Sequence, residues 1–285
     1  MTRLIAISVL TLLLTACALP PQGGGRHAIG GAAPAGAPHP AIDVSPAVRL
    51  DLAPGGRLKA AINFGNPILA QRDPATGEPR GVSVDLAREL GRRLGVPVDL
   101  VLFDSAGRVS AAARTSAWDI AFLAVDPGRA GEIAFSPPYV VIEGAYLVRE
   151  SSPIRSNDQV DQPGVRVVVG RGSAYDLYLS REIRRATLVH ADTSPAVTDR
   201  MMAQGIEVAA GVKQQLQADS RRHPGTRLLP ESFMSIHQAM GTPRGRLAGA
   251  DYLNQFVEAM KAEGFVAASL RRHGIEGASI APAAR

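Results

Sequence analysis

The chain has 285 residues, a formal net charge of +5 and 5 % aromatic residues. Of its 31 basic residues only Lys59, Lys213 and Lys261 are lysines, and the arginines are dispersed along the chain, often beside acids. A nucleic-acid-binding surface would gather its basic residues and interleave them with aromatic ones. The composition therefore argues against a nucleic acid as partner, and the excess of arginine indicates no more than a weak preference for anionic ligands.

The first residues are typical of an export signal. Arg3 precedes an apolar run over 4–14 that is too short to span a bilayer comfortably, so we assign 1–16 to a secretory signal peptide. Residues 14–17 (LTAC) resemble the lipobox of bacterial lipoproteins, in which the cysteine is acylated. Cys17 is the only cysteine, which excludes an intramolecular disulfide and favours its lipidation. The alternative is an ordinary signal peptide cleaved nearby, with Cys17 a chance residue.

Residues 17–47 are rich in Pro, Gly and Ala and contain almost no large apolar side chains. Such a segment cannot bury a core. We therefore expect a disordered linker that tethers the folded part, by its lipid anchor, to a bacterial membrane on the periplasmic side.

From residue 58 onward, short apolar runs alternate with amphipathic stretches, a pattern typical of βα units around a mostly parallel sheet. The clearest helix has Val82, Leu86, Leu90 and Leu94 at four-residue spacing, with Gly95 directly after it. The other elements expected in this first series are strands over 58–62, 98–103 and 118–125 and a short helix over 106–114.

A second series of the same kind follows. We expect strands over 165–169 and 187–189 and helices over 173–185 and 195–204, and the segments 206–210, 213–222 and 227–229 complete the series. A last amphipathic helix, which contains Leu247, Phe256 and Met260, follows a segment rich in Gly and Pro over 241–245. Two βα clusters, with a tail that can return to the first, predict an α/β fold of two lobes with a cleft between them.

Four blocks of sequence carry a resemblance to a known family. The four blocks are 63–67 (NFGNP), 81–90 (GVSVDLAREL), 118–121 (WDIA) and 126–139 (DPGRAGEIAFSPPY). In these blocks the chain is similar to the family 3 extracellular solute-binding proteins, the polar amino-acid type of ABC importer, and the resemblance continues through 165–176 to about 274.

This resemblance implies a type II periplasmic-binding-protein fold, in which the lobes close on a ligand by a hinge motion and present a changed surface to a membrane permease. Lobe 1 is expected to comprise 48–140 plus 236–275, and lobe 2 to comprise 143–232. The hinge would lie where the chain crosses near 138–146 and again near 232–242.

Arg129 matches the arginine that, in this family, clamps the carboxylate of the ligand. A planar guanidinium suits that role because it offers two parallel donors to a carboxylate. The alternative is an arginine at a helix start that bonds only to a neighbouring loop.

The segment 170–176 (GRGSAYD) follows a strand and opens a helix, so its N–H groups and the positive helix end should face the cleft. Ser173 followed by Asp176 also predicts a capping box, and both roles can hold at once. It is not a dinucleotide fingerprint, because a tyrosine stands where the third glycine is needed. The residues expected at the ligand here are Gly172, Ser173, Ala174 and Tyr175.

Two further strand ends are expected at the ligand. Asn63, Phe64 and Asn66 occupy the first strand-to-helix loop, where the family usually places an aromatic side chain over the ligand. Phe64 could be that aromatic, and core packing is its alternative role. Phe122 and Ala124, at the end of the strand over 118–125, match positions whose backbone contacts the ligand in relatives.

Two positions depart from the family's amino-acid binders. The resemblance puts Ala124 where they usually carry a hydroxyl residue, and Val212 where they carry a carboxylate for the ligand's ammonium. An ammonium buried without an acidic partner is costly. We therefore expect a small carboxylate or another organic anion without an ammonium, or an amino acid if Asp126 or Asp176 substitutes for the missing acid.

Two other functions remain open. An enzyme on this fold, similar to cyclohexadienyl dehydratases, would need an acid or base in the cleft, but Asp126, Asp176 and Glu143 all have simpler structural roles. The six histidines show no metal-ligand spacing. A ligand sensor without transport is the other possibility.

We expect a monomeric binding protein that is not an enzyme and uses no cofactor or metal. It would capture a small anionic metabolite and deliver it to an ABC permease in the inner membrane.

Overall fold

The computed structural model describes residues 42–284. The predicted signal peptide and Cys17 lie outside these residues. The first element, α1 (Pro46–Leu52), includes the last two residues of the predicted linker, which was expected to end at 47. Ser45 caps this helix by accepting a hydrogen bond from the Val48 N–H, and Pro46 opens its first turn, where a missing N–H has no intrahelical partner to lose.

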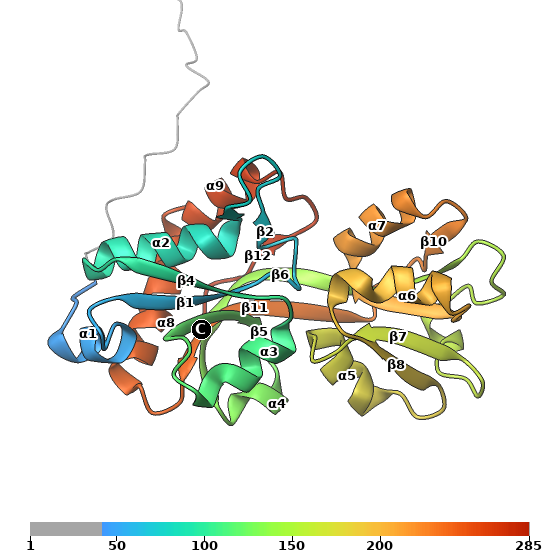
Figure 1. Cartoon of the computed structure of the whole chain (residues 1–285), viewed down its shortest axis with the longest axis horizontal. Coiled ribbons are helices and arrows are strands. Elements are labelled where there is room, and N and C mark those ends of the chain that lie inside the picture. Colours follow the sequence, from blue (N-terminus) through green and yellow to red (C-terminus); the bar gives the residue numbers. More distant parts are fainter. Residues whose placement is uncertain (1–41, 285) are drawn as a thin grey trace, which may run out of the picture. The chain divides into compact units, whose positions relative to one another are not determined.

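One mixed sheet carries the fold, with the strand order β4-β1-β5-β11-β6-β9-β7-β8 (Figure 1). β1 is parallel to β4 and β5, and β7 is parallel to β8 and β9. Between these two parallel groups, β11 and β6 run antiparallel to each other and to their outer neighbours. The eight strands are β1 (Leu58–Asn63), β4 (Val98–Phe103), β5 (Ile120–Ala124), β6 (Ile133–Arg149), β7 (Arg166–Gly170), β8 (Thr187–Ala191), β9 (Val208–Val212) and β11 (Met234–Pro243).

Four short strands complete the sheets. β10 (Thr226–Leu228) and β12 (Ser279–Ile280) both pair with β6, and β2 (Gln71–Arg72) forms a separate hairpin with β3 (Pro79–Arg80). The remaining helices are α2 (Val82–Leu94), α3 (Ala106–Ala111), α4 (Pro127–Ala130), α5 (Ala174–Glu182), α6 (Val197–Ala203), α7 (Lys213–Arg222), α8 (Leu247–Ala262) and α9 (Phe265–Arg272), with 3-10 turns η1 (Ala112–Arg114), η2 (Asn157–Gln159) and η3 (Ser194–Ala196).

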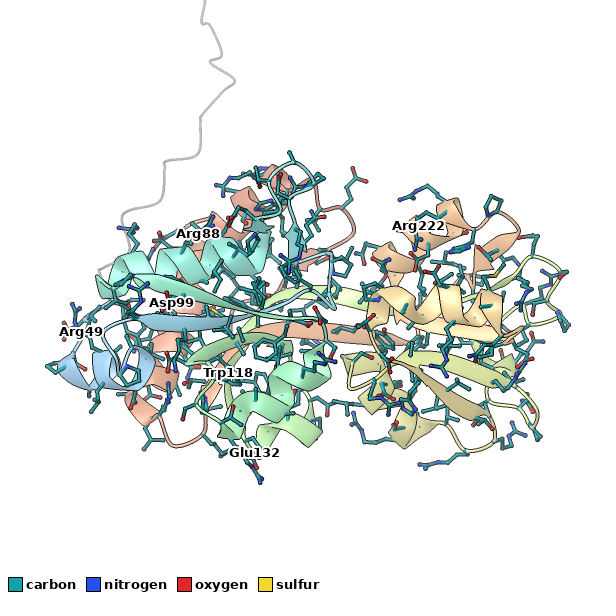
Figure 2. The ribbon with its side chains drawn as sticks, in the orientation of Figure 1. Arg49, Arg88, Asp99, Trp118, Glu132 and Arg222 are labelled. Carbon is teal, nitrogen blue, oxygen red and sulfur yellow. The ribbon has the colours of Figure 1, made fainter. Side chains whose placement is uncertain are left out.

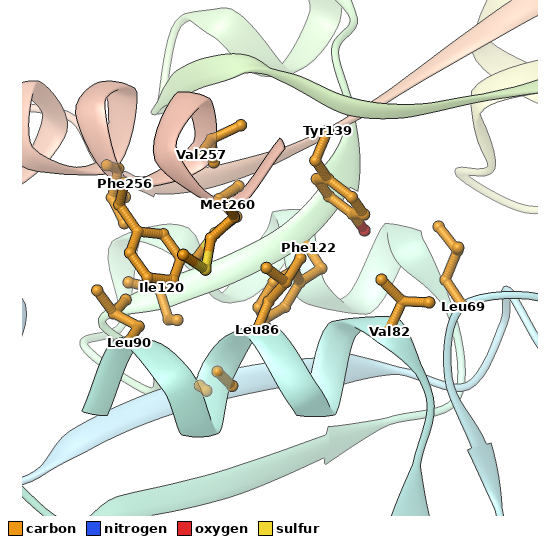
Figure 3. Close-up of a cluster of buried hydrophobic side chains, with 14 of the residues drawn as sticks. Leu69, Val82, Leu86, Leu90, Ile120, Phe122, Tyr139, Phe256, Val257 and Met260 are labelled. Atoms are coloured by element: carbon orange, nitrogen blue, oxygen red, sulfur yellow. The ribbon is translucent and has the colours of Figure 1, made fainter. Parts of the chain in front are cut away.

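The hydrophobic core is divided between the two parallel groups. Around β1 and β5, the apolar face of α2 packs against α8, with Leu86, Leu90, Phe122, Phe256 and Met260 in contact (Figure 3). Two other clusters consist of residues between 145 and 229, on the two faces of β7 and β9. We call the half built on β1, β4 and β5 lobe 1 and the half built on β7, β8 and β9 lobe 2. Among the described elements, only β6 and β11 run from one lobe to the other.

The predicted α/β, two-lobed class is confirmed, although the sheet is mixed rather than mostly parallel. The domain boundaries given above stay a prediction. The best local prediction is α2, whose four apolar residues are all fully buried. Gly95 ends the helix in the left-handed conformation at φ 68°, which a glycine adopts without steric cost.

The basic residues are spread over the surface, as the sequence indicated. Arg49, Arg88 and Arg222 are exposed on α1, α2 and α7, three separate helices (Figure 2). Trp118, in contrast, is fully buried beneath α3, and its indole N–H donates to the Val109 carbonyl at 3.0 Å. No basic cluster with interleaved aromatics forms on these helices.

The C-terminal residues add a strand to the middle of the fold. β12 pairs antiparallel with β6, so that Ser279 lies opposite Val141 and Ile280 opposite Val140. The Ala281 N–H extends this pairing by donating to the Tyr139 carbonyl at 3.2 Å. The chain end therefore covers the edge of the strand that joins the two lobes, an element that the sequence patterns did not predict.

We predict that Ala281→Pro lowers the free energy of unfolding by about 1–3 kcal/mol, because proline removes this N–H and leaves the Tyr139 carbonyl without its donor. Ala283→Pro is the control, since Ala283 is exposed and also lies next to Pro282. Urea denaturation measures both variants. Equal stabilities would show that the C-terminal pairing contributes nothing.

Candidate functional site

A small cavity, partly open to solvent, lies between the two lobes. The carboxyl ends of the parallel strands form much of its wall, which is where ligands bind in open α/β sheets. Its lining residues are Asn63, Gly65, Asn66, Ala106, Leu123, Ala124, Arg129, Ser173, Ala174, Tyr175, Ser194, Val212, Ile236 and Gln238.

Arg129, on the short helix α4, is only 3 % exposed. Its Nη1 donates to the Ala124 carbonyl and its Nη2 to the Gly172 carbonyl, each at 2.8 Å. Its Nε has no partner among the described residues. Burial lowers the pKa of Arg129 to about 10, with the nearby Asp126 acting in the opposite direction. The side chain is therefore a buried cation at neutral pH whose Nε remains an unpaired donor.

The start of α5 brings further donors from lobe 2. Ser173 Oγ accepts from the Asp176 N–H at 3.0 Å, and the Leu177 N–H bonds to the Ser173 carbonyl. The first two N–H groups of the helix, those of Ala174 and Tyr175, thus remain for an acceptor from outside the helix. Together with the helix dipole they favour an anion.

The predicted capping box at Ser173 is only half formed. Asp176 Oδ2 accepts from the Gly172 N–H at 2.7 Å instead of from the Ser173 N–H, which donates to the Gly170 carbonyl. An aspartate is one methylene shorter than the glutamate of a full box. The loop is still fixed, because the side chains of Ser173 and Asp176 each accept a hydrogen bond from a backbone N–H.

The two acids considered as ammonium partners are both occupied. Asp126 caps α4 through the Gly128 N–H and forms an ion pair with Arg181 of α5 at 2.8 Å. Asp176 bonds to the Gly172 N–H and to His190 Nε2, the latter at 2.9 Å. Neither residue lines the cavity.

Three contacts hold the lobes together across the cavity mouth. Two are the Arg129 bond to the Gly172 carbonyl and the Asp126–Arg181 ion pair. The third is a close approach of two glycines: a Cβ on Gly172 would lie 2.6 Å from the Gly107 Cα, and a Cβ on Gly107 would lie 3.1 Å from the Arg171 carbonyl oxygen. The lobes can meet this closely only because both positions lack a side chain.

Most of the residues predicted at the ligand line this one cavity, namely Asn63, Asn66, Ala124, Arg129, Ser173, Ala174 and Tyr175. Gly172 does not line the cavity, but its carbonyl accepts a hydrogen bond from Arg129, which does. Phe64 is half-buried and packs against the lobe 1 core, with the Arg72 guanidinium 4.7 Å above its ring. Phe122 packs edge-on against Tyr139 in the same core. The Phe64 side chain thus takes the core-packing alternative, whereas the expectation for Phe122 concerns its backbone and stays a prediction.

Six lining residues were not predicted. Ala106 and Leu123 have no polar side chain that would single them out, and Gly65 lies inside a motif that was recognised. Ser194 follows β8 at the start of η3, in the same place relative to its strand as Ser173; this could have been a signal. Ile236 and Gln238 lie on β11, and nothing local marks them, because only the return of the chain brings them to the cavity.

Among residues 42–284, no group of three His, Cys, Asp or Glu side chains is placed to hold a metal ion. Within the same residues, no helix has the length and apolar character needed to cross a membrane.

Residues 60–275 match the model of the bacterial extracellular solute-binding proteins, family 3. No curated protein sequence matches the chain significantly.

Several solved structures are similar over nearly their whole length. A mutant of ArgBP from T. maritima has 19 % identity and a TM-score of 0.68, covering 79 % of this chain and 98 % of its own. An ancestral amino acid-binding protein, a precursor of cyclohexadienyl dehydratase, has 18 % identity and a TM-score of 0.66, with coverage of 76 % and 95 %. A histidine kinase sensor domain has 18 % identity and a TM-score of 0.68, with coverage of 78 % and 97 %. At these identities the likeness shows the fold alone.

We predict that Gly107→Val keeps the lobes from closing as they do here, because the added side chain would meet the Gly172 backbone. Solution scattering of the ligand-bound proteins should give a larger radius of gyration for the variant than for the wild type. Gly131→Val is the control, since nothing lies within 4 Å of a Cβ at Gly131. Equal radii for all three proteins would contradict the importance of this contact.

Proposed function

Because the chain belongs to family 3 of the bacterial extracellular solute-binding proteins, we propose that it captures a small organic anion in the cavity between its lobes. The observation that carries this proposal is Arg129. A guanidinium that is nearly fully buried, bonded only to carbonyls and left with a free Nε, is costly unless an anion completes its hydrogen bonds.

Both lobes contribute to the proposed anion site. Arg129 comes from lobe 1, whereas the free N–H groups of Ala174 and Tyr175 come from lobe 2. The Arg129 bond to the Gly172 carbonyl brings the guanidinium beside the start of α5. An anion bound to both sets of donors would favour the closed arrangement, as expected for capture by hinge closure.

We further propose that the protein works on the periplasmic side of a bacterial membrane, held there by a lipid on Cys17, and delivers its ligand to an ABC permease. Family membership supports an extracytoplasmic location and the link to ABC importers. The Leu14-Thr15-Ala16-Cys17 sequence supports the lipid anchor.

A second candidate is a ligand sensor without transport, favoured by the likeness to a histidine kinase sensor domain. Binding and closure would be the same in both cases, and only the partner would differ. An adjacent permease and ATPase gene would support transport, and an adjacent sensor kinase gene would support signalling.

The likeness to an ancestral precursor of a dehydratase raises an enzyme as a further alternative. A catalytic acid or base has to face the substrate. Asp126 and Asp176 are bonded elsewhere, and Glu143 accepts from Lys213 Nζ at 2.7 Å. This arrangement supports binding rather than catalysis.

We predict that Arg129→Met weakens binding about 100-fold, since hydrogen bonds to a charged group contribute roughly 1.5–3 kcal/mol each and tenfold in affinity is about 1.4 kcal/mol. A thermal-shift screen with a library of carboxylates and amino acids identifies a ligand, and calorimetry then measures both proteins. Arg88→Met, on the exposed face of α2, is the control. Unchanged binding by the Arg129 variant would remove the basis of the proposed function.

We predict that Cys17→Ser moves the protein from the membrane fraction to the soluble periplasmic fraction, because it removes the acylation site. Fractionation with immunodetection of the wild type and the variant is the measurement. A wild type found only in the soluble fraction would rule out the lipid anchor and leave ligand binding untouched.

A further inference from the structure

We infer that the ligand is an organic acid that carries a neutral hydrogen-bond donor, such as a hydroxyl group, and no ammonium. This inference rests on the proposed function and narrows it. It begins with the charges of the cavity wall: Arg129 is the only charged side chain among the described lining residues. The other polar side chains there are neutral, namely Asn63, Asn66, Ser173, Tyr175, Ser194 and Gln238.

A zwitterion would find no anionic partner for its cationic end among the described lining residues. The α-ammonium of an amino acid is two bonds from the carboxylate carbon, so it would lie close to the guanidinium that binds the carboxylate. Like charges disfavour each other's ionised form, and a buried ammonium also loses its hydration. An α-hydroxyl in the same place carries neither cost.

The side chains of Asp126 and Asp176 cannot turn toward the cavity without losing bonds that they already make. Asp126 would have to leave Arg181 and the cap of α4, and Asp176 would have to leave His190 and the Gly172 N–H. Both are 5 % exposed. These bonds also fix the two segments that present Arg129 and α5, so releasing either acid would disturb the anion site itself.

The cavity wall also contains an unpaired acceptor, so the ligand should carry a hydrogen-bond donor as well as its anionic oxygens. Asn66 Oδ1 is buried and has no donor among the described residues. Asn63 Oδ1, in contrast, already accepts from the Gly65 N–H at 2.9 Å. A ligand hydroxyl or amide N–H would satisfy Asn66, whereas a ligand with only acceptor oxygens would leave it unpaired.

Val212 is the position that sets this preference. It lines the cavity at the end of β9 and is also the N-cap of α7, where it makes no side-chain cap bond. Aspartate and asparagine are both favoured N-caps, so both can replace Val212 without weakening the helix start. They have nearly the same shape, and only aspartate carries the negative charge that an ammonium needs, which makes them a matched pair.

The experiment is calorimetric titration of the wild type, Val212→Asp and Val212→Asn with pairs that differ only in this group: L-lactate and L-alanine, L-malate and L-aspartate, L-2-hydroxyglutarate and L-glutamate. For the wild type we expect the hydroxy acid of at least one pair to bind 100-fold more tightly than its amino acid. Val212→Asp should shift that ratio at least tenfold toward the amino acid, and Val212→Asn should not.

Two results would overturn the inference. One is an amino acid that binds the wild type as tightly as its hydroxy acid; if that binding still depends on Arg129, the proposed function stands and only the ligand class is wrong. The other is no binding by either series, in which case the Arg129→Met test on the wider library decides the proposed function separately.

Discussion

The Arg129 guanidinium is held by two carbonyl oxygens that belong to opposite lobes, that of Ala124 at the end of β5 and that of Gly172 before α5. Among residues 42–284 no carboxylate bonds to this charge in place of the water that it loses on burial, and carbonyl dipoles compensate only in part. Much else at the cleft follows from this constraint. Asp126 caps the helix that carries Arg129 while binding Arg181 of the opposite lobe, and Asp176 fixes the loop whose carbonyl Arg129 needs. The acids near the site stabilise the frame around the cation instead of neutralising it.

Local pattern was sufficient to predict the elements whose apolar periodicity and caps agree. β4 and α7 have the predicted bounds, and α2 ends at its glycine. The long strand β6 was missed because Pro137 and Pro138 in its middle indicate a loop. Proline removes a ladder donor and is tolerated where pairing is irregular; the register between β6 and β11 shifts at Ala239, which lies opposite Pro138. α9 and β12 were missed because their short amphipathic or apolar stretches mean little until α8 and β6 are in place beside them.

The residues of the candidate site likewise separate into those that local sequence predicts and those that depend on the rest of the fold. Residues at or shortly after the carboxyl ends of strands, such as Asn63, Arg129 and Ser173, could be predicted because motif and position agree. Gln238 could not, since it reaches the cavity only after the chain has built lobe 2 and returned along β11. Phe64 was placed in the right loop, but a loop position does not fix a side-chain direction, and packing against the core and under Arg72 decides it.

Two of the three contacts between the lobes are weak, and this bears on how binding can be coupled to closure. Arg181 is 43 % exposed in its pair with Asp126, so this pair contributes about 1 kcal/mol or less. The glycine contact adds only van der Waals attraction. Moving a two-state equilibrium from 1:99 to 99:1 takes about 5.5 kcal/mol of differential binding. Two or three hydrogen bonds between an anion and the Arg129 Nε and α5 amides, at roughly 1.5–3 kcal/mol each for a charged group, match that requirement. The ligand, rather than the contacts between the lobes, would then decide which arrangement dominates.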